Sequence, residues 1–294
     1  LSIKMPLKDF IEFKKHLHGG SEESNKFPNY SYDTSRSLLF TEYMAGPLHE
    51  KLVSMIHKGL NIAESQLPSS IRTKIQVVRN QKFIVHNGVH KGSEKVPDLA
   101  FQVTNNKGKM EVKFVLEVGV AETYEKLIED ARLWLEGTKT VSLVMLVKLE
   151  ETPVYKCPIR DFTEETLAKI NFPPFNKIPE QDFLLASPFG PAVFKEFTWV
   201  GEISGFFEFW KLDPVTKLAT CISTRMVSYS LRDLIDIGEE HDKAIYFDWK
   251  EYLGILPPSI KELAVYRCSC AIRDIARKAN GLDSDYQQPS QAGS

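Results

Sequence analysis

One stretch of the sequence, from Pro97 to Gly137, limits the folds open to this chain more than any other. It reads PDLAFQVTNNKGKMEVKFVLEVGVAETYEKLIEDARLWLEG, with an aspartate at the start of one strand-like run and a glutamate at the end of the next. A helical pattern begins almost immediately afterwards. Because consecutive antiparallel strands run in opposite directions, this order predicts that Asp98 and Glu117 reach the same end of a sheet.

The two strand patterns place their acids differently. In Asp98–Val103 every second residue is strongly apolar, and the asparagines and Gly108 that follow tolerate positive φ and predict a hairpin. In Glu111–Val118, Glu117 is an isolated charge at the far end of an apolar strand. A buried carboxylate is costly unless it is paired or bound to a metal, so Glu117 is the more informative acid.

Two carboxylates at one strand end suit a divalent cation. Mg2+ takes oxygen ligands, is commonly held by one or two carboxylates, and completes its shell with water and phosphate oxygens. The implied chemistry is hydrolysis of a phosphodiester. Simpler roles stay open: Asp98 is also typical of a turn after Pro97, and Glu117 also suits a salt bridge to a Lys or Arg of a neighbouring strand.

The residues around this hairpin predict an α/β unit. Ala121–Glu136 has apolar residues at a spacing of three and four, as in an amphipathic helix, and Gly137 suits its C-terminal stop. Val141–Val147 is almost continuously apolar, as in a central strand covered on both faces. Upstream, the predicted elements are one helix and two strands, at Pro47–Glu64, Lys74–Arg79 and Lys82–Asn87.

These residues resemble the PD-(D/E)XK nuclease superfamily, whose signature is matched by Pro97-Asp98 and by Glu117-Val118-Gly119. The strings VLEVG, ETYEKL and DARLWLEG also resemble a group of fungal proteins. The likeness covers residues 36–155. It implies a restriction-endonuclease-like α/β core, in which a helix precedes an antiparallel three-strand meander, a second helix crosses over, and a further strand joins the sheet.

The resemblance also implies a set of metal ligands. Asp98, Glu117 and the main-chain carbonyl of Val118 would bind Mg2+ or Mn2+. Family members often carry another acid on the first helix, and Glu50 is the candidate for that role. Glu50 lies opposite the apolar stripe of its predicted helix, where a solvated glutamate would lie as well.

The chain departs from the family pattern at Gly119, where a lysine is expected two residues after the glutamate. That lysine would orient the attacking water and stabilise the charge that develops on the phosphate. Lys126, in the first turn of the following helix, is the main candidate to replace it, although an ordinary solvated lysine fits the same position. Lys113, on the strand face of Glu117, and Lys95, just before Asp98, are further candidates.

Basic residues are concentrated around the first of these acids. From Arg72 to Lys113 there are nine Lys or Arg and three acids, whereas the whole chain has a net charge of -2. Such residues suit phosphate contacts, and they are also common in hairpin loops that promote solubility. The candidate nucleic-acid contacts are Arg72, Lys74, Arg79, Lys82, Lys107 and Lys109. DNA is favoured over RNA as the partner, and homodimer formation is compatible with the sequence.

The whole chain has 294 residues, of which 43% are apolar, as in an ordinary globular protein. It contains no apolar run long enough to span a bilayer and no signal-peptide pattern, which favours an intracellular protein of the cytoplasm or nucleus without membrane contact. Its cysteines are sparse and irregularly spaced, so neither a disulfide nor a structural zinc site is predicted.

The sequence predicts four segments: an N-terminal arm (1–35), the nuclease-like core (36–155), a mixed α+β C-terminal extension packed on the core (156–280), and a disordered tail (281–294). Helices are expected at Leu7–Leu17 and Phe162–Ile170, paired strands in the aromatic run Phe194–Trp210, and a final helix at Ser259–Ala279.

The favoured function is that of a metal-dependent nuclease, with Asp98 and Glu117 as metal ligands and Lys126 orienting the water. Because a fold does not determine a function, a second class stays open. The chain would then be a catalytically inactive nuclease-fold module that binds protein or nucleic acid, an alternative that Gly119 favours. An α/β-hydrolase or a nucleotide-binding enzyme lacks support, since the chain has neither G-x-S-x-G nor a phosphate-binding glycine loop.

Overall fold

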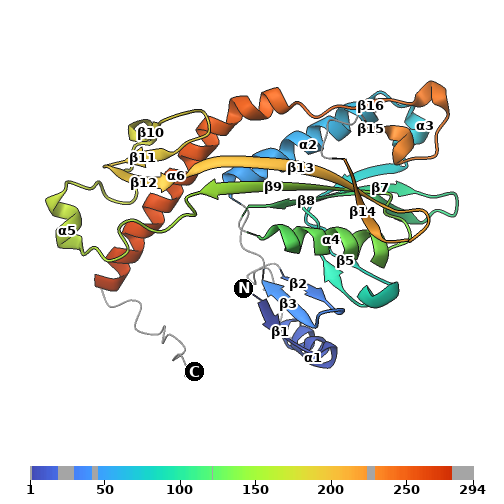
Figure 1. Ribbon diagram of the computed structural model, residues 1–294, viewed down its shortest axis with the longest axis horizontal. Coiled ribbons are helices and arrows are strands. Elements are labelled where there is room, and N and C mark those ends of the chain that lie inside the picture. The colour runs from blue at the N-terminus through green and yellow to red at the C-terminus, as the bar shows by residue number, and fades with distance from the viewer. Residues whose placement is uncertain (1, 19–29, 42–45, 121, 224–228, 280–294) are drawn as a thin grey trace. The chain divides into compact units, whose positions relative to one another are not determined.

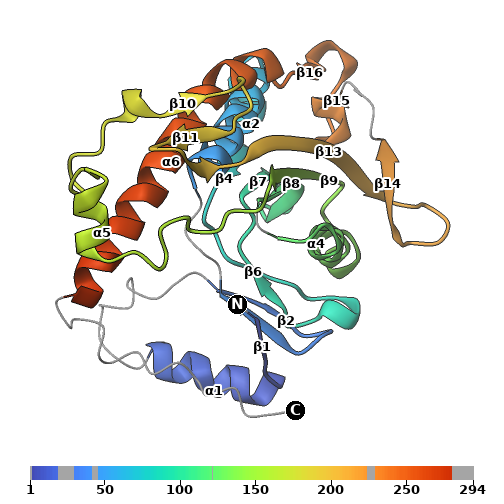
Figure 2. The same ribbon diagram turned by 60° about the vertical axis from the view of Figure 1, so that its left-hand side comes forward.

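The computed structural model describes residues 2–18, 30–41, 46–120, 122–223 and 229–279 (Figures 1 and 2). The described chain is a mixed α/β protein. It divides into two units, one made of residues 1–149 and 205–252 and the other of residues 150–204 and 253–294. The expected arm, the expected core up to residue 149 and part of the expected extension are therefore grouped in the first unit, whereas residues 150–155 of the expected core belong to the second. The tail expected at 281–294 lies outside the described residues.

The first unit is built on a sheet of six strands in the order β14-β13-β9-β8-β7-β4. Strands β4, β7 and β8 are neighbours in an antiparallel meander, and β9 is parallel to β8. Between β4 and β7 the chain passes through β5 and β6, which belong to a second sheet. The strands span Ile75–Val78 (β4), Leu99–Thr104 (β7), Met110–Gly119 (β8), Leu143–Thr152 (β9), Glu202–Leu212 (β13) and Ala219–Ser223 (β14). The predicted hairpin and central strand are thus confirmed.

Helix α4 (Tyr124–Gly137) connects the parallel strands β8 and β9, as a parallel pair requires a crossover. Thr123 caps its N-terminus, because the threonine hydroxyl accepts a hydrogen bond from the Lys126 amide at 3.3 Å. Helix α4 lies below the main sheet in Figure 1. The buried side chains of Leu127, Ala131 and Trp134 form its inner face and belong to a core cluster with residues of β8 and β9. This is the helix that the apolar spacing predicted.

Helix α2 (Pro47–Ser65) covers the opposite face of the same sheet (Figure 1). It begins with a proline, whose missing amide hydrogen costs nothing in the first turn of a helix. A side chain at Gly59 would place its Cβ 2.4 Å from the Tyr246 carbonyl oxygen, so only glycine allows this close approach. Smaller elements nearby are α3 (Ser69–Arg72) and the paired strands β15 (Tyr229–Ser230) and β16 (Ala244–Ile245).

A second sheet of the same unit has five strands in the order β1-β3-β2-β6-β5. Its strands span Ser2–Lys4 (β1), Tyr30–Asp33 (β2), Leu38–Thr41 (β3), Phe83–Ile84 (β5) and Glu94–Lys95 (β6). The predicted N-terminal helix is confirmed as α1 (Leu7–His18). It packs through Phe10, whose ring stacks on that of Tyr32 with centroids 4.0 Å apart.

The predicted strand Lys82–Asn87 is wrong in its extent and in its sheet. Only Phe83–Ile84 is a strand, and it pairs with β6 in the five-stranded sheet rather than with the meander. Asn80 adopts a positive φ of 58° in the turn after β4, which takes the chain away from the main sheet. Ile84 is 53% exposed, so the apolar run Phe83–Val85 is not wholly buried.

The second unit contains α5 (Glu164–Lys169) and a three-stranded sheet of β10 (Leu184–Leu185), β11 (Ala192–Phe194) and β12 (Phe197–Val200). The helix expected at Phe162–Ile170 is confirmed within a few residues. The aromatic run was expected to form paired strands, and β11 and β12 do pair, with Phe194 opposite Phe197. Its second half, however, is β13 of the main sheet.

The final helix, α6 (Trp249–Ala279), begins before the expected Ser259. It continues through Pro257 and Pro258, although a proline inside a helix removes a hydrogen bond and usually kinks or ends the helix. The two prolines leave the carbonyls of Leu253 and Gly254 without their usual amide donors. Both residues are exposed, so water can satisfy these carbonyls. Among the helices of the described ranges, none has the length and apolar character needed to cross a bilayer.

Candidate active site

The structure brings the two signature acids together at one end of the main sheet. Asp98 directly precedes β7, and Glu117 lies near the end of β8. Leu99 pairs with Leu116 in the antiparallel ladder, so Asp98 and Glu117 occupy neighbouring positions on adjacent strands. The predicted placement at a shared strand end is therefore confirmed.

The Asp98 carboxylate is held by two donors. Its Oδ2 accepts a hydrogen bond from the Val118 amide at 2.6 Å, and its Oδ1 lies 2.8 Å from Nε2 of His49, in the first turn of α2. Burial opposes protonation of His49, but the hydrogen bond and charge of Asp98 outweigh it and raise the histidine pKa. His49 thus orients Asp98, and its protonated form is stabilised by this contact. No sequence pattern indicated this role.

Glu117 is almost completely enclosed. Its Oε1 accepts a hydrogen bond from Nε1 of Trp134 at 2.6 Å, and Nζ of Lys95 lies 3.5 Å from its Oε2. Burial raises the pKa of Glu117 well above its ordinary value, although the charge of Lys95 acts in the opposite direction. The carboxyl therefore holds its proton more tightly than an exposed glutamate does.

A third acid, Asp130 of α4, joins Lys95 and Lys126. Nζ of Lys95 lies 3.0 Å from Oδ2 of Asp130, and the Lys126 ammonium forms an ion pair with Oδ1. Burial disfavours the charged carboxylate, but the two lysines outweigh it and lower the pKa of Asp130. The expectation that Lys126 approaches Glu117 is therefore not met, because its ammonium pairs with Asp130 one turn further along the helix.

Sequence reasoning missed Asp130, although one signal was present. Asp130 lies between Leu127 and Trp134 on the inner stripe of the predicted helix, where a carboxylate needs a buried partner. Lys95, which the sequence offered only as a secondary candidate, is that partner. Together, the six ionisable residues that meet at this strand end form what we call the charge cluster: His49, Lys95, Asp98, Glu117, Lys126 and Asp130.

The charge cluster is expensive to bury. The side chains of Lys95, Glu117 and Asp130 are 7%, 6% and 4% exposed. Desolvating several charges costs as much as, or more than, their mutual attraction returns, so apolar residues in their place would often be as stable. Buried groups with strongly shifted pKa values concentrate at functional sites. The charge cluster is therefore the candidate active site of this chain.

Of two other candidates from the sequence, Glu50 lies beside the charge cluster and Lys113 lies outside it. The Glu50 carboxylate pairs with Arg79, and its Oε1 lies 3.5 Å from Nδ1 of His49. Glu50 thus adjoins the charge cluster through His49. Lys113 pairs instead with Glu111 at 2.8 Å, several residues earlier on β8.

The basic residues do not surround the acids as expected. Arg79 is paired with Glu50, and Lys82 lies 3.9 Å from Glu94 and 3.6 Å from the centre of the Tyr30 ring. The remaining four lie at the other end of β7 and β8, about 20 Å away at 3.3 Å per strand residue. These four are Arg72, Lys74, Lys107 and Lys109. The acids lie at the open end of the β7–β8 hairpin, whereas Lys107 and Lys109 lie in its turn. Residues that are close in sequence are therefore separated by the length of the strands.

The donor set fits Mg2+ in kind. Asp98 and Glu117 supply the one or two carboxylates that such a site needs, with water and phosphate oxygens completing the shell. The described ranges contain no group of three or more His, Cys, Asp or Glu side chains placed to hold a metal ion. A metal at this site would therefore depend on the two carboxylates, each of which already has a protein partner. The proposed contribution of the Val118 carbonyl stays a prediction.

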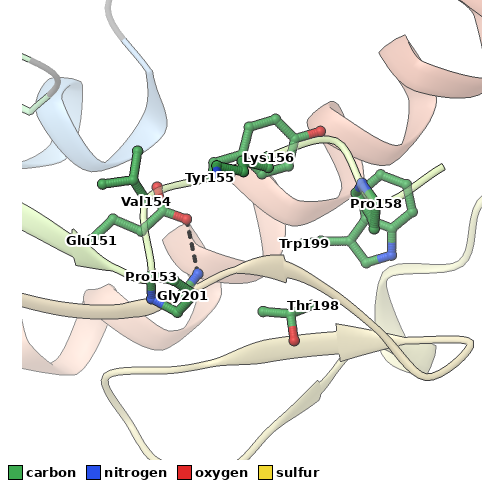
Figure 3. Close-up of a pocket in the computed structure, with 9 residues that line it drawn as sticks. All are labelled: Glu151, Pro153, Val154, Tyr155, Lys156, Pro158, Thr198, Trp199 and Gly201. Carbon is green, nitrogen blue, oxygen red and sulfur yellow. Dashed lines mark hydrogen bonds between the residues drawn. The ribbon is translucent and has the colours of Figure 1, made fainter. Parts of the chain in front are cut away.

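The second unit contains a separate pocket of about 420 Å³ (Figure 3). Its one acid, Glu151, accepts hydrogen bonds from both terminal nitrogens of Arg267, at 2.6 and 2.8 Å, and from the Gly201 amide at 2.8 Å. The Arg267 guanidinium lies 4.1 Å from the centre of the Tyr155 ring. This arrangement pairs one acid with one base and has the character of a structural ion pair.

Comparisons with known proteins give no further guidance. The chain matches no protein-family model, no curated protein and no solved structure. The functional assignment therefore rests on the sequence and on the geometry of the charge cluster.

Proposed function

We propose that this chain is a metal-dependent nuclease that hydrolyses nucleic-acid phosphodiesters, with DNA as the favoured substrate. Asp98 and Glu117 would hold Mg2+ or Mn2+. Lys95, rather than Lys126, would supply the ammonium that the signature lacks at Gly119. The observation that carries this proposal is the buried Lys95 ammonium 3.5 Å from the Glu117 carboxylate, at the strand end that also holds Asp98.

The order of elements supports the same proposal. Helix α2, the meander of β4, β7 and β8, the crossover helix α4 and the parallel strand β9 follow the order of a restriction-endonuclease-like core. We assign the chain to that fold as part of the proposal.

Each residue of the charge cluster has a role in the proposed reaction. When bound, the metal would polarise the phosphate and lower the pKa of the attacking water. Lys95 would orient that water and stabilise the negative charge that develops on the phosphate. His49 and the Val118 amide orient Asp98, and Trp134 orients Glu117. Asp130 anchors Lys95 from α4 and acts as a positioning residue.

Metal binding can be measured without any assay of activity. Trp134 donates its indole hydrogen to Glu117, so bound Mn2+ should quench its fluorescence. We expect Trp134→Phe to remove the quenching signal and Glu117→Gln to remove binding. Because the pKa of Glu117 is raised, Mn2+ binding should release a proton and become tighter as the pH rises. Quenching that persists in Glu117→Gln would contradict the assignment of this ligand.

Cleavage assays with Mg2+ and Mn2+ on double-stranded DNA, single-stranded DNA and RNA test the activity. We expect wild-type cleavage that is lost in Asp98→Asn and in Lys95→Met. Lys126→Met is the matched control. Both lysines pair with Asp130, but in the described part of the chain the ion pair with Glu117 is made by Lys95 and not by Lys126. Wild-type cleavage that survives in Asp98→Asn, or equal losses in the two lysine variants, would overturn the proposed roles.

A second candidate function is a nuclease-fold module that binds nucleic acid or protein without cutting. It is favoured by Gly119 and by the protein donors that already occupy both carboxylates. Under this alternative the wild type binds its partner with no metal-dependent cleavage. Asp98→Asn and Glu117→Gln would then leave binding unchanged or strengthen it, since they remove clustered negative charge.

A further inference from the structure

We propose that Lys74, Lys107 and Lys109 form a second phosphate-binding surface, which contacts a nucleic-acid strand about six nucleotides from the site of cleavage. We call it the distal basic surface. This inference rests on the proposed nuclease function and specifies how its substrate would be held. It also gives a role to basic residues that the structure places away from the acids.

The turn between β7 and β8 presents two of these lysines in a fixed way. The side-chain oxygen of Asn105 accepts hydrogen bonds from the amides of Lys107 and Lys109, at 2.9 and 3.0 Å. Its side-chain nitrogen donates to Glu111 at 2.7 Å, and Gly108 adopts a positive φ of 72°. Such a turn needs little further ordering when a ligand binds, which lowers the entropic cost of binding.

Lys74 lies beside this turn. Its carbonyl accepts a hydrogen bond from the Thr104 amide at 2.7 Å, and its side chain is exposed, as are those of Lys107 and Lys109. Within the described part of the chain, none of these three ammonium groups has a carboxylate within ion-pair distance. They are therefore available to an anionic ligand.

A depression of about 690 Å³ adjoins the surface and is lined by Lys74, Asn105, Asn106 and Ser142. Acids also line it, but two of them already have partners. Glu111 binds Lys113 and Asn105, and Asp233 binds Lys211 and the Ser230 amide. Among the described residues, Asp236 is the one lining acid without such a partner. Of the lining bases, Lys113 and Arg232 are also paired, so the unpaired Lys74 and Asp236 offset each other. The positive balance that favours a phosphate ligand therefore comes from Lys107 and Lys109 on the adjoining turn.

The distance to the acids determines the expected substrate length. Six strand residues separate Asp98 from the turn, which corresponds to about 20 Å at 3.3 Å per residue. A nucleic-acid strand advances about 3.4 Å per nucleotide, so this distance corresponds to about six nucleotides. The edge strand β4 runs beside four of the six residues of β7, with Ile75 opposite Val103 and Val78 opposite Ala100.

The test is a binding measurement in EDTA, so that it does not depend on catalysis. The triple variant Lys74→Ala, Lys107→Ala, Lys109→Ala is compared with the wild type by fluorescence anisotropy on 6-, 12- and 24-base-pair DNA. The matched control removes three exposed lysines of the second sheet region, as Lys4→Ala, Lys8→Ala, Lys91→Ala. Both triple variants lose the same formal charge.

We expect the distal triple variant to bind 24-base-pair DNA more weakly. Its slope of log affinity against log salt should fall by about 0.9 for each phosphate that the variant no longer neutralises, or about 2.7 for three phosphates. The same variant should match the wild type on 6-base-pair DNA, and the control should keep the wild-type slope on all lengths.

Several outcomes would overturn the inference. An equal fall of the slope in the control, a weakening that does not depend on DNA length, or equally tight binding of polyglutamate would each show that the surface is not a specific phosphate site. If the wild type binds with the expected length dependence but does not cleave, the nuclease proposal fails and the distal surface stands. If the wild type cleaves and the distal triple variant binds DNA as tightly as the wild type, the distal surface fails and the nuclease proposal stands.

Discussion

The two units of this chain treat buried charge in different ways. In the second unit, Glu151 and Arg267 form a bidentate pair that involves both oxygens and both terminal nitrogens. In the first unit, three acids share two lysines and a histidine. Their pKa values move in different directions, since burial raises that of Glu117 while lysine charges lower that of Asp130 against the effect of burial.

This difference separates a structural ion pair, whose charges and hydrogen bonds are matched, from a site that still has polar groups able to bind a ligand. The Glu151 pair is matched in charge and in geometry, which is the condition under which burial of charge is tolerated. The charge cluster is not matched in this way. Nδ1 of His49 is buried and lies 3.5 Å from the Glu50 carboxylate without a well-formed hydrogen bond, and burial raises the pKa of Glu117. A cluster that still has groups to satisfy can accept a ligand, whereas a completed pair cannot.

The largest expected effect is on catalysis, and it belongs to the first unit alone. Glu117→Gln should lower the rate of metal-dependent cleavage by about a thousandfold or more, because it removes a proposed ligand of the metal that would polarise the phosphate. Arg267→Met should leave the rate per folded molecule within about threefold under conditions where the variant is folded. Steady-state cleavage rates of both variants test this prediction, with the folded fraction of each variant taken from its urea unfolding curve. Equal losses would show that the two sites do not differ in function.

The next effect is on stability, and it should be larger in the second unit. Arg267→Met leaves Glu151 buried without its partner and should lower the free energy of unfolding by about 3 kcal/mol. Lys95→Met should cost less, since Glu117 can respond by keeping its proton. Urea denaturation at neutral pH measures both changes. A larger loss in Lys95→Met would mean that the charge cluster is the structural element and the Glu151 pair is not.

The smallest effect is the pH dependence that Glu117 adds to stability. The folded protein binds the Glu117 proton more tightly than the unfolded chain does, so the stabilisation is complete below the ordinary pKa of 4.5. It is lost as the pH rises from there through the higher folded pKa. Glu117→Gln should remove this pH-dependent loss of stability, because glutamine does not titrate. The free energy of unfolding, measured in EDTA at pH 5 and pH 8, should therefore fall less in the variant than in the wild type.

Much of the first unit could be predicted because its signals are local. The apolar spacing of α2 and α4 and the hairpin of β7 and β8 depend on neighbouring residues alone. The hairpin also determines that Asp98 and Glu117 reach the same end, since reversal of the chain is built into its turn. The sequence failed at residues 82–87, where a short apolar run gave no information about which sheet the strand would join.

The partners of the two acids were decided by the tertiary structure. Lys95 reaches Glu117 because β6 pairs with β2 and β5, strands that periodicity cannot assign to one another. His49 reaches Asp98 through the packing of α2 on the sheet, and Asp130 reaches Lys95 from the opposite helix. The sequence by itself therefore determined the helices, the hairpin and the two carboxylates. Only long-range strand pairing and helix packing decided which cations and donors surround them, because those contacts join residues with no local pattern in common.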